Sequence, residues 1–171
     1  MKKQIVLIFI MALFGDIQID HSSNIHFGTI HRVKDFSFIK VPFRLANYSN
    51  KIAYKDFELT SKAALEFSIK DPFKDSFFNL ELREIYLSWY ALFGQLNFGN
   101  IIHSWGILSN NSPIDNLSPV NYYYIFSKGT ERKISQFSLT GDIYIYNHSF
   151  AFAFNPNHKG TTIPLNDSEL P

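Results

Sequence analysis

The chain has 171 residues with 16 basic and 15 acidic side chains, a formal charge of +1, so it lacks the clustered basic excess of a nucleic-acid-binding surface. It contains no cysteine, which excludes disulfides, thiolate metal ligands and cysteine nucleophiles. One domain is expected for this length.

Residues 1–15 have the layout of a secretory signal peptide. Lys2 and Lys3 precede an apolar run from Ile5 to Phe14, and Gly15 is the small residue at the expected cleavage point. The run is shorter than the about 20 residues that a membrane-spanning helix needs. We therefore predict export from the cytoplasm, with residues 16–171 as the folded part. A buried first strand or helix is the alternative.

Beyond residue 20, apolar residues recur mainly with period two, which is typical of β-strands. Residues 25–33 and 36–45 are aromatic-rich and predict two strands. The clearest alternation covers residues 56–70, which would reach about 50 Å at about 3.3 Å per residue, far beyond an ordinary strand. Its apolar series is Phe57, Leu59, Ala63, Leu65, Phe67 and Ile69, and its polar series is Asp56, Glu58, Thr60, Lys62, Glu66, Ser68 and Lys70.

Residues 83–90 and 95–105 predict a hairpin that turns between Ala91 and Gly94. One face carries Ile85, Leu87, Trp89, Leu96, Phe98 and Ile102, and the other carries Glu84, Tyr86, Ser88, Gln95, Asn97, His103 and Trp105. Because Arg83 and Glu84 are adjacent, we expect them on opposite faces. An amphipathic helix over residues 80–93 is the alternative, since several large apolar residues there also have helical spacing.

The C-terminal third predicts a second hairpin and two long loops. Residues 134–146 and 150–154 alternate in the same way, with a turn around Asn147 and His148. Residues 107–133 and 156–171 contain prolines and small polar residues without periodicity, so we predict loops, the first with a short helical turn over 122–126.

These elements predict an all-β fold: an antiparallel up-and-down transmembrane β-barrel that is incomplete. About six or seven strands are expected, whereas single-chain bacterial barrels close with an even number of at least eight, so we interpret the chain as the N-terminal part of a larger barrel. Long strands and unequal connections favour this fold over a secreted soluble β-sandwich that binds carbohydrate, which is the alternative. Aromatic residues near strand ends also favour it; they are Tyr54, Phe57, Trp89, Tyr90, Tyr144 and Tyr146.

Four short motifs carry a resemblance to a known family. They are Arg83, Glu84, Tyr86, Leu87 and Trp89; then Gly94 and Gly99; then Ser104, Trp105 and Gly106; then Pro113, Asp115, Leu117 and Pro119. As an ordered set over about forty residues, they resemble porin-like outer-membrane β-barrels of Gram-negative bacteria, related to alginate-export channels. The resemblance implies an outer-membrane location and a barrel architecture. Asn100 and Ile101 stand where members often have a basic residue and glutamine, so no charge selectivity carries over.

The polar faces of these strands are predicted to line a water-filled lumen. The predicted lining residues are Glu58, Lys62, Glu66, Glu84, Tyr86, Asn97, His103 and Trp105. Glu84 is expected opposite a basic residue of a neighbouring strand. A solvated sheet face is the alternative for the charged series, and ordinary polar packing is the alternative for His103.

The loop over 107–133 is predicted to narrow this lumen, with Pro113, Asp115 and Pro119 as the constriction. Asp115 would hold the loop through an Asx-turn or a lumen arginine, and a generic loop turn is the alternative.

The sequence predicts neither catalysis nor a cofactor. His21, His26 and His31 are spaced by five, so on a strand they alternate between faces and do not converge on a metal. The sequence has no nucleophile elbow, His-x-x-x-His pair or Gly-rich phosphate loop. We therefore expect a channel whose partners are outer-membrane lipid and small hydrophilic solutes. Homo-oligomerisation stays open.

Overall fold

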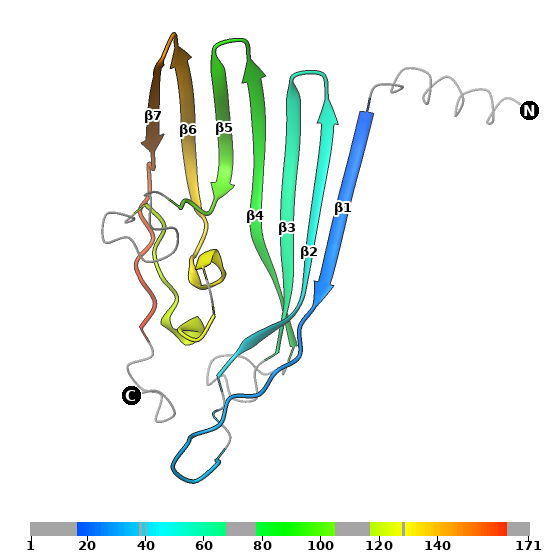
Figure 1. Cartoon of the computed structure of the whole chain (residues 1–171), viewed down its shortest axis with the longest axis vertical. Coiled ribbons are helices and arrows are strands. Elements are labelled where there is room, and N and C mark those ends of the chain that lie inside the picture. Colours follow the sequence, from blue (N-terminus) through cyan, green and yellow to red (C-terminus); the bar gives the residue numbers. More distant parts are fainter. Residues whose placement is uncertain are drawn as a thin grey trace, which may run out of the picture.

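Seven strands form a single antiparallel sheet in which each strand pairs with the next along the chain (Figure 1). The structure is a computed structural model, and it describes residues 17–37, 39, 41–67, 78–104, 117–127 and 129–163. The strands are β1 (Ile17–Ile25), β2 (Phe43–Tyr54), β3 (Phe57–Phe67), β4 (Phe78–Ala91), β5 (Gly94–Ile101), β6 (Gln136–Ile145) and β7 (His148–Phe154). The all-β, up-and-down prediction is confirmed, and the described strands do not form the two packed sheets of a sandwich.

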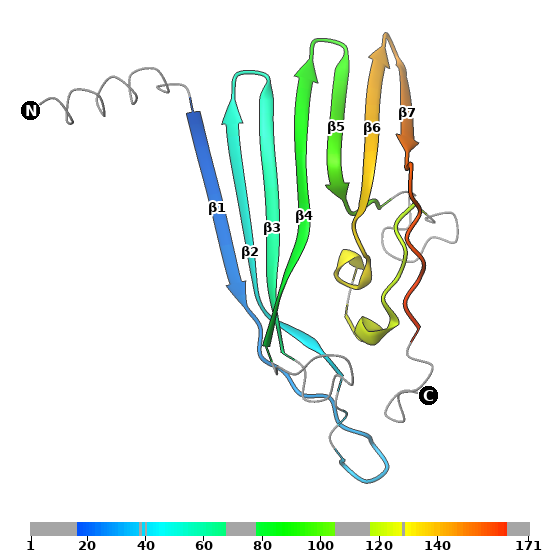
Figure 2. The same cartoon turned by 180° about the vertical axis from the view of Figure 1, so that it is seen from behind.

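Short and long connections lie at opposite ends of the sheet (Figures 1 and 2). The hairpins β2–β3, β4–β5 and β6–β7 turn through two residues each, and the described residues between β1 and β2 and between β5 and β6 lie at the other end, the loop end. The predicted turns near residues 91–94 and at Asn147 are confirmed. The helix alternative for residues 80–93 is wrong, because β4 pairs with both β3 and β5. The predicted signal peptide lies outside the described residues.

The first strand lies elsewhere than predicted. Strands were expected over 25–33 and 36–45, whereas β1 ends at Ile25 and β2 begins only at Phe43. The sequence of β1, IQIDHSSNI, has three large apolar residues and little alternation, so it gives a weak local signal. Pairing with β2 along its whole length, from Ile17 opposite Tyr54 to Ile25 opposite Ala46, stabilises it instead. Among the residues described, no helix has the length and apolar character needed to span a membrane.

One side of the sheet, the apolar face, carries a continuous row of large apolar side chains. The row contains one residue from each strand in direct register: Ile19, Ile52, Leu59, Leu87, Phe98, Leu139 and Phe154. Most of these side chains are exposed; Phe98 is 52% exposed and Phe154 is 61% exposed. Leu65, Phe67, Leu87 and Phe98 are therefore not gathered in an enclosed interior, since they share this open face.

The opposite side, the polar face, is the sheltered one. Its fully buried side chains are Thr60, Ser88, Gln136 and Ser138. A water-soluble domain usually buries apolar side chains and exposes polar ones. Here the sheet buries polar side chains and exposes a broad apolar surface, which is the reverse. The two faces thus have, over most of the sheet, the composition that the alternation predicts, and the polar face is the more buried one.

Polar residues interrupt the apolar face next to the continuous row. In direct register there, β1, β2, β3 and β5 carry His21, Asn50, Ser61 and Asn100, whereas β4 carries Ile85 and β6 carries Phe137. Toward the loop end the face is aromatic again.

That aromatic end is built from Phe43, Phe67 and Phe78 on β2, β3 and β4. The Phe67 ring lies between the other two, with centroid distances of 5.4 Å to Phe43 and 5.2 Å to Phe78. Adjacent strands thus contribute a packed row of rings at this level of the sheet.

A β-bulge places Arg83 and Glu84 on the same face, which corrects the expectation that they lie on opposite faces. Glu84 pairs with Lys62 and Leu82 pairs with Ala63, so Arg83 is an extra residue in β4. Both Arg83 and Glu84 are 6% exposed and lie on the polar face. Adjacent residues alternate only in a regular strand, and the bulge removes that condition.

We expect that Gly99→Ala destabilises the sheet by about 2 kcal/mol or more. Gly99 has a φ of 141°, and a Cβ atom there would lie 2.4 Å from the backbone oxygen of Ile85, so the neighbouring strand must move. The midpoint of urea unfolding in detergent measures this effect. Gly28→Ala is the control because a Cβ atom at Gly28 would meet nothing within 4 Å. Equal midpoints for the two variants would contradict the prediction.

Candidate functional site on the polar face

The described residues 117–127 and 129–135, here called the inner segment, fold against the polar face near the loop end of the sheet. They contain two single-turn 3-10 helices, η1 (Tyr122–Tyr124) and η2 (Gly129–Arg132) (Figure 2). The predicted helical turn over 122–126 is thus found at η1, where the Asn121 side chain accepts from the backbone N–H of Tyr123 at 3.1 Å. The inner segment is the described part of the loop predicted to narrow a lumen.

Arg83 anchors η2 to the sheet. Its guanidinium donates to the Glu131 backbone oxygen at 3.0 Å, to the Glu131 carboxylate at 3.1 Å and to the Thr130 backbone oxygen at 2.9 Å. A further, longer bond reaches the Lys133 backbone oxygen at 3.4 Å. The bulge in β4 aims this arginine inward, so the irregularity of the strand creates the anchor. A planar guanidinium with five donors suits several acceptors at once.

Arg44 on β2 is the second anchor. It donates to the Glu81 carboxylate at 3.0 and 3.3 Å and to the Glu131 carboxylate at 3.3 Å, and it also bonds the Glu131 backbone oxygen. Its charge lies 3.6 Å from Glu66 and its guanidinium carbon lies 3.9 Å from the centre of the Tyr124 ring. Two strands that are not neighbours therefore hold the same turn of the inner segment.

Tyr124 closes this cluster from the side of η1. It is 4% exposed, and its hydroxyl donates to the Glu66 carboxylate, which also accepts from the Asn79 amide at 3.1 Å. Burial, followed by the negative charge of Glu66, raises the pKa of the Tyr124 hydroxyl above its ordinary value of 10.0. Tyr124 therefore remains a neutral donor at every physiological pH.

We expect that Tyr124→Phe lowers the free energy of unfolding by about 1–2 kcal/mol at neutral pH, because the Glu66 carboxylate loses a buried donor. In the unfolded chain Tyr124 ionises near pH 10, whereas in the folded chain it holds its proton to higher pH. The unfolded state thus loses protons first, and this contribution to stability is complete below about pH 10 and falls above it. Urea midpoints from pH 7 to 11 measure the effect. Parallel pH profiles for Tyr124→Phe and the unmodified chain would contradict it.

Residues that follow β5 and β7 hold the rest of the inner segment. The His103 backbone N–H donates to the Ser118 hydroxyl at 2.7 Å, and the Lys133 ammonium donates to the His103 backbone oxygen at 2.7 Å. The described residues after β7 run beside the inner segment, where Tyr122 donates to Thr162 at 2.9 Å and Thr162 donates to Val120 at 3.0 Å through their backbones. The inner segment is therefore fixed along its length.

Toward the short turns, uncharged and charged side chains form a hydrogen-bonded layer on the polar face. Asn97 is its centre: its amide oxygen accepts from Ser88 at 2.7 Å and Gln95 at 2.6 Å, and its amide nitrogen donates to Thr140 at 3.2 Å. Elsewhere in this layer Glu58 lies 3.4 Å from Lys51 and accepts from Thr60 at 3.1 Å.

Glu84 pairs with a basic residue on the adjacent strand, as predicted. Its carboxylate lies 2.5 Å from the Lys62 ammonium and accepts from the Ile102 backbone N–H at 2.9 Å. The carboxylate thus joins β3, β4 and the residue that follows β5.

The structure places most of the predicted site residues on the polar face. Those found there are Glu58, Lys62, Glu66, Glu84, Tyr86, Asn97 and His103. His103 lies 2.8 Å from the Ser138 hydroxyl. Trp105, Pro113 and Asp115 lie outside the described residues. Pro119 lies in the inner segment and its oxygen accepts from the Ile134 N–H at 2.9 Å, which is a local backbone role.

The residues that hold the inner segment were not predicted from the sequence. They are Arg44, Arg83, Tyr124, Glu131 and Lys133. The predicted contact of Asp115 with a lumen arginine lies outside the described residues, and within the inner segment the carboxylate that contacts strand arginines is Glu131. The arginines within the predicted strands were the one available signal for these contacts. A guanidinium that becomes buried on a sheet needs hydrogen-bond acceptors from another segment. Among the residues described, no group of histidines, cysteines and carboxylates could hold a metal ion.

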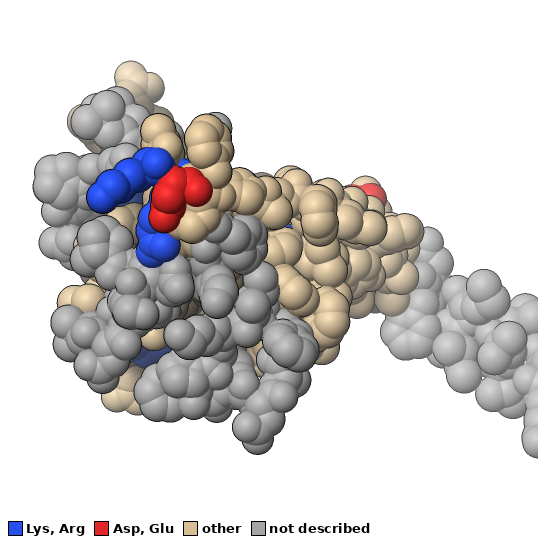
Figure 3. Space-filling model, turned by 90° about the horizontal axis from the view of Figure 1, so that it is seen from below, with Lys and Arg blue, Asp and Glu red and all other residues tan. Residues whose placement is uncertain are grey.

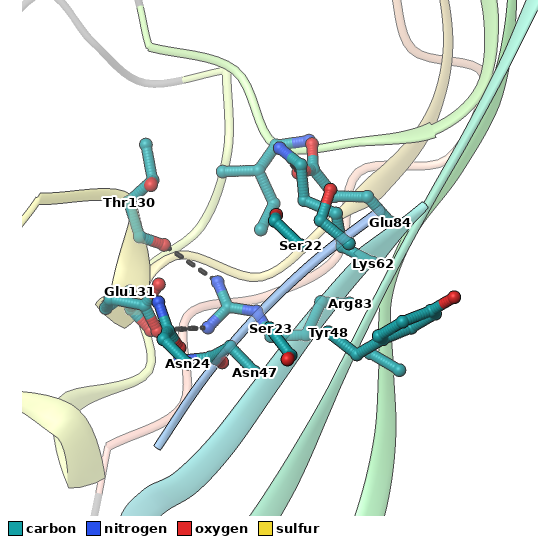
Figure 4. A pocket seen from close by; sticks show the side chains of 13 residues that line it. Ser22, Ser23, Asn24, Asn47, Tyr48, Lys62, Arg83, Glu84, Thr130 and Glu131 are labelled. Carbon is teal, nitrogen blue, oxygen red and sulfur yellow. Dashed lines mark hydrogen bonds and ion pairs between the residues drawn. The ribbon is translucent and has the colours of Figure 1, made fainter. Parts of the chain in front are cut away.

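A cavity of about 230 Å³ lies between the first four strands and η2 (Figure 4). The Arg83 guanidinium points toward Glu131 and Thr130 on one side, and Ser22, Lys62 and Glu84 lie on another. The cavity thus borders two ion pairs, Lys62–Glu84 and Arg83–Glu131. Figure 3, a view onto the loop end, shows basic and acidic side chains beside one another rather than one sign gathered alone.

Comparison of the chain with protein families, curated proteins and solved structures finds no match. The structure therefore has to be classified from its own architecture. Its described residues form an open, seven-stranded up-and-down sheet with an exposed apolar face and a segment folded onto its polar face.

Proposed function

We propose that this chain forms part of the wall of an outer-membrane β-barrel that passes small hydrophilic solutes. The observation that carries the proposal is the reversal of the two faces, because a barrel in lipid turns apolar side chains outward and polar side chains toward water. Lipid also demands that every backbone polar group be paired, and the pairing of each strand with the next meets that demand where the strands run side by side.

The spacing of aromatic residues on the apolar face supports a lipid-facing band. Tyr54, Phe57 and Trp89 share a level near the short turns, and Phe67 lies in the aromatic row toward the loop end. Phe57 and Phe67 begin and end β3, so they are about 33 Å apart along a strand that rises about 3.3 Å per residue. With a tilt of about 40°, this gives a height of about 25 Å, the height of the apolar band in such barrels.

Closure of the barrel requires further strands. Because six successive pairings are antiparallel, β1 and β7 run in the same direction, and pairing them with each other would be parallel. An antiparallel barrel therefore needs an odd number of additional strands between these two edges. The proposal requires that residues outside the described part, or another polypeptide, supply them.

The inner segment supports the role of a constriction. It occupies the polar face, on the side where the proposed lumen lies, and two arginines and a buried tyrosine fix it there. A fixed segment narrows a pore by a constant amount, whereas a loose loop would not.

Fluorescence of Trp89 tests the proposal. The chain has two tryptophans, so Trp105→Phe leaves only Trp89, which lies on the apolar face. In vesicles that contain brominated lipids, we expect strong quenching of Trp89. Fractionation of expressing cells should recover the protein in the outer membrane. Unquenched fluorescence together with recovery in a soluble fraction would reject the membrane proposal. Silent planar bilayers with a membrane-inserted, closed barrel would reject the channel but not the location.

A further inference from the structure

The charges that border the cavity between the first four strands and η2 are already paired. Lys62 and Glu84 are 2.5 Å apart, and Arg83 and Glu131 are 3.1 Å apart. An anionic ligand would have to displace Glu131 or Glu84, and a cationic ligand would have to displace Lys62 or Arg83. Glu84 and Arg83 are buried, with side-chain exposures of 7% and 6%, whereas Lys62 and Glu131 are 43% and 44% exposed, so a charged ligand must compete with a partner that is already in place.

Four neutral polar side chains of β1 and β2 also line the cavity. Ser22 and Asn24 on β1 stand directly across from Ser49 and Asn47 on β2, and all four line the cavity. Because residues two apart on a strand share a face, these side chains make one patch, here called the amide–hydroxyl patch. Within the residues that the structure describes, none of the four side chains makes a hydrogen bond or an ion pair.

The chemistry of this patch suits one class of ligand. Two serine hydroxyls and two carboxamides can both donate and accept hydrogen bonds, and none carries charge. A solute with several adjacent hydroxyl groups also donates and accepts, so it can replace the water on the patch without leaving any group unpaired. Aliphatic solutes would leave the hydrogen-bonding groups of the patch unsatisfied, and ions would have to compete with the paired charges that line the same cavity.

We propose that the amide–hydroxyl patch and the cavity beside it bind a neutral, polyhydroxylated small solute of the sugar or polyol class. This inference rests on the proposed function, in which the polar face borders the water-filled path. It adds the chemical class of the solute and the residues that recognise it. The ion pairs Lys62–Glu84 and Arg83–Glu131 act here by excluding charged competitors, while the four neutral side chains make the contacts.

Solute titration followed by NMR tests the inference on the full chain refolded in detergent. The probes are sucrose, which is neutral, digalacturonate, which is anionic, and glucosamine, which is cationic. We expect saturable shifts of the Asn24 and Asn47 side-chain amide signals with sucrose at millimolar concentrations. Each charged probe should bind at least about fivefold more weakly, the effect of about one lost hydrogen bond. Equal or tighter binding of either charged probe would overturn the inference, as would the absence of saturable sucrose binding.

Matched variants locate the site. Asn47→Ala should weaken sucrose binding about fivefold, since one donor and acceptor group is lost. Asn50→Ala is the control, because Asn50 lies on the same strand and faces the opposite side of the sheet. Ser22→Ala provides a second variant at an exposed position without side-chain partners among the described residues. If sucrose binds equally to Asn47→Ala, Ser22→Ala and Asn50→Ala, the assigned site is wrong.

The Trp89 quenching experiment separates this inference from the function on which it rests. Quenched Trp89 without saturable sucrose binding rejects the solute class and leaves the membrane wall standing. Unquenched Trp89 with sucrose binding that depends on Asn47 rejects the membrane wall and keeps the binding site.

Discussion

Arg83→Met is expected to release the inner segment from the polar face. The substitution keeps the length of the side chain but removes the donors to Glu131, Thr130 and Lys133. The Glu131 and Thr130 backbone oxygens keep one partner each, the Arg44 guanidinium and the Lys133 N–H, but lose their bonds to Arg83. The loss of charged hydrogen bonds of this kind costs about 3 kcal/mol. Local opening of the segment should therefore become about a hundredfold more frequent.

Limited trypsin digestion measures this opening, because Arg132 and Lys133 lie in the inner segment and Lys133 is only 3% exposed. Cleavage after these residues should accelerate in Arg83→Met, while cleavage in the strands should not. Lys62→Met is the matched control: Lys62 is also a basic residue on the polar face, and its ion pair is with Glu84 in β4. Equal rates of cleavage in the two variants would show that Arg83 does not hold the segment.

A double-mutant cycle separates the contact of Arg83 with the Glu131 carboxylate from its contacts with backbone oxygens. Glu131→Gln retains a polar side chain but removes the charge that faces both Arg83 and Arg44. If the contact is direct, the effects of Arg83→Met and Glu131→Gln should not add, with a coupling of about 1–2 kcal/mol. Additive effects would assign the anchoring to the backbone oxygens of η2 alone.

The period-two alternation was sufficient to predict the middle of the sheet. In β3 the series from Phe57 to Phe67 assigns each side chain to the face on which the structure places it. Such alternation is a local property, since each residue reports its own side of the strand. The same holds for β6 and β7, where phenylalanines and leucine lie on the apolar face.

Features that depend on partners distant in the sequence could not be predicted in this way. The nine residues of β1 have mixed polarity, and their strand depends on β2, which lies beyond a long loop. The bulge at Arg83 depends on the register with β3, and the residue types of β4 do not predict it. The contact between Arg44 and Glu131 joins residues 87 positions apart. Sequence pattern identified the polar face, but only the register identified which side chains meet on it.

The polar interruption of the apolar face also depends on strand register and could not be predicted from the sequence. Ser61 appears in the sequence as an irregularity of the alternation, whereas in the sheet it lies beside Asn50 and across from Ile85. The interruption is thus a patch shared by neighbouring strands rather than an isolated substitution. In the proposed barrel this patch would be the least lipid-like part of the wall.

A lysine placed on the apolar face should be far more damaging than one placed on the polar face of the same strand. Ile52 belongs to the continuous apolar row, and Ala53, the next residue of β2, faces the polar side opposite Glu58. In lipid, Ile52→Lys should cost about 2–4 kcal/mol, because a charge would face hydrocarbon, whereas Ala53→Lys places the same charge beside a carboxylate and near water. In a water-soluble sheet the exposed face would accept either lysine with little effect.

The two variants are compared by urea unfolding in vesicles and by the fraction of refolded protein that inserts into them. The unmodified Lys51, which faces the polar side near Glu58, provides an internal reference for a lysine that the fold accepts. A large loss for Ile52→Lys with near-normal Ala53→Lys assigns lipid to the apolar face. Similar stability for both would mean that water, and not hydrocarbon, covers Ile52. Because the proposed lumen and its solute site both depend on which solvent lies on each side, this pair of variants tests the physical basis of the function most directly.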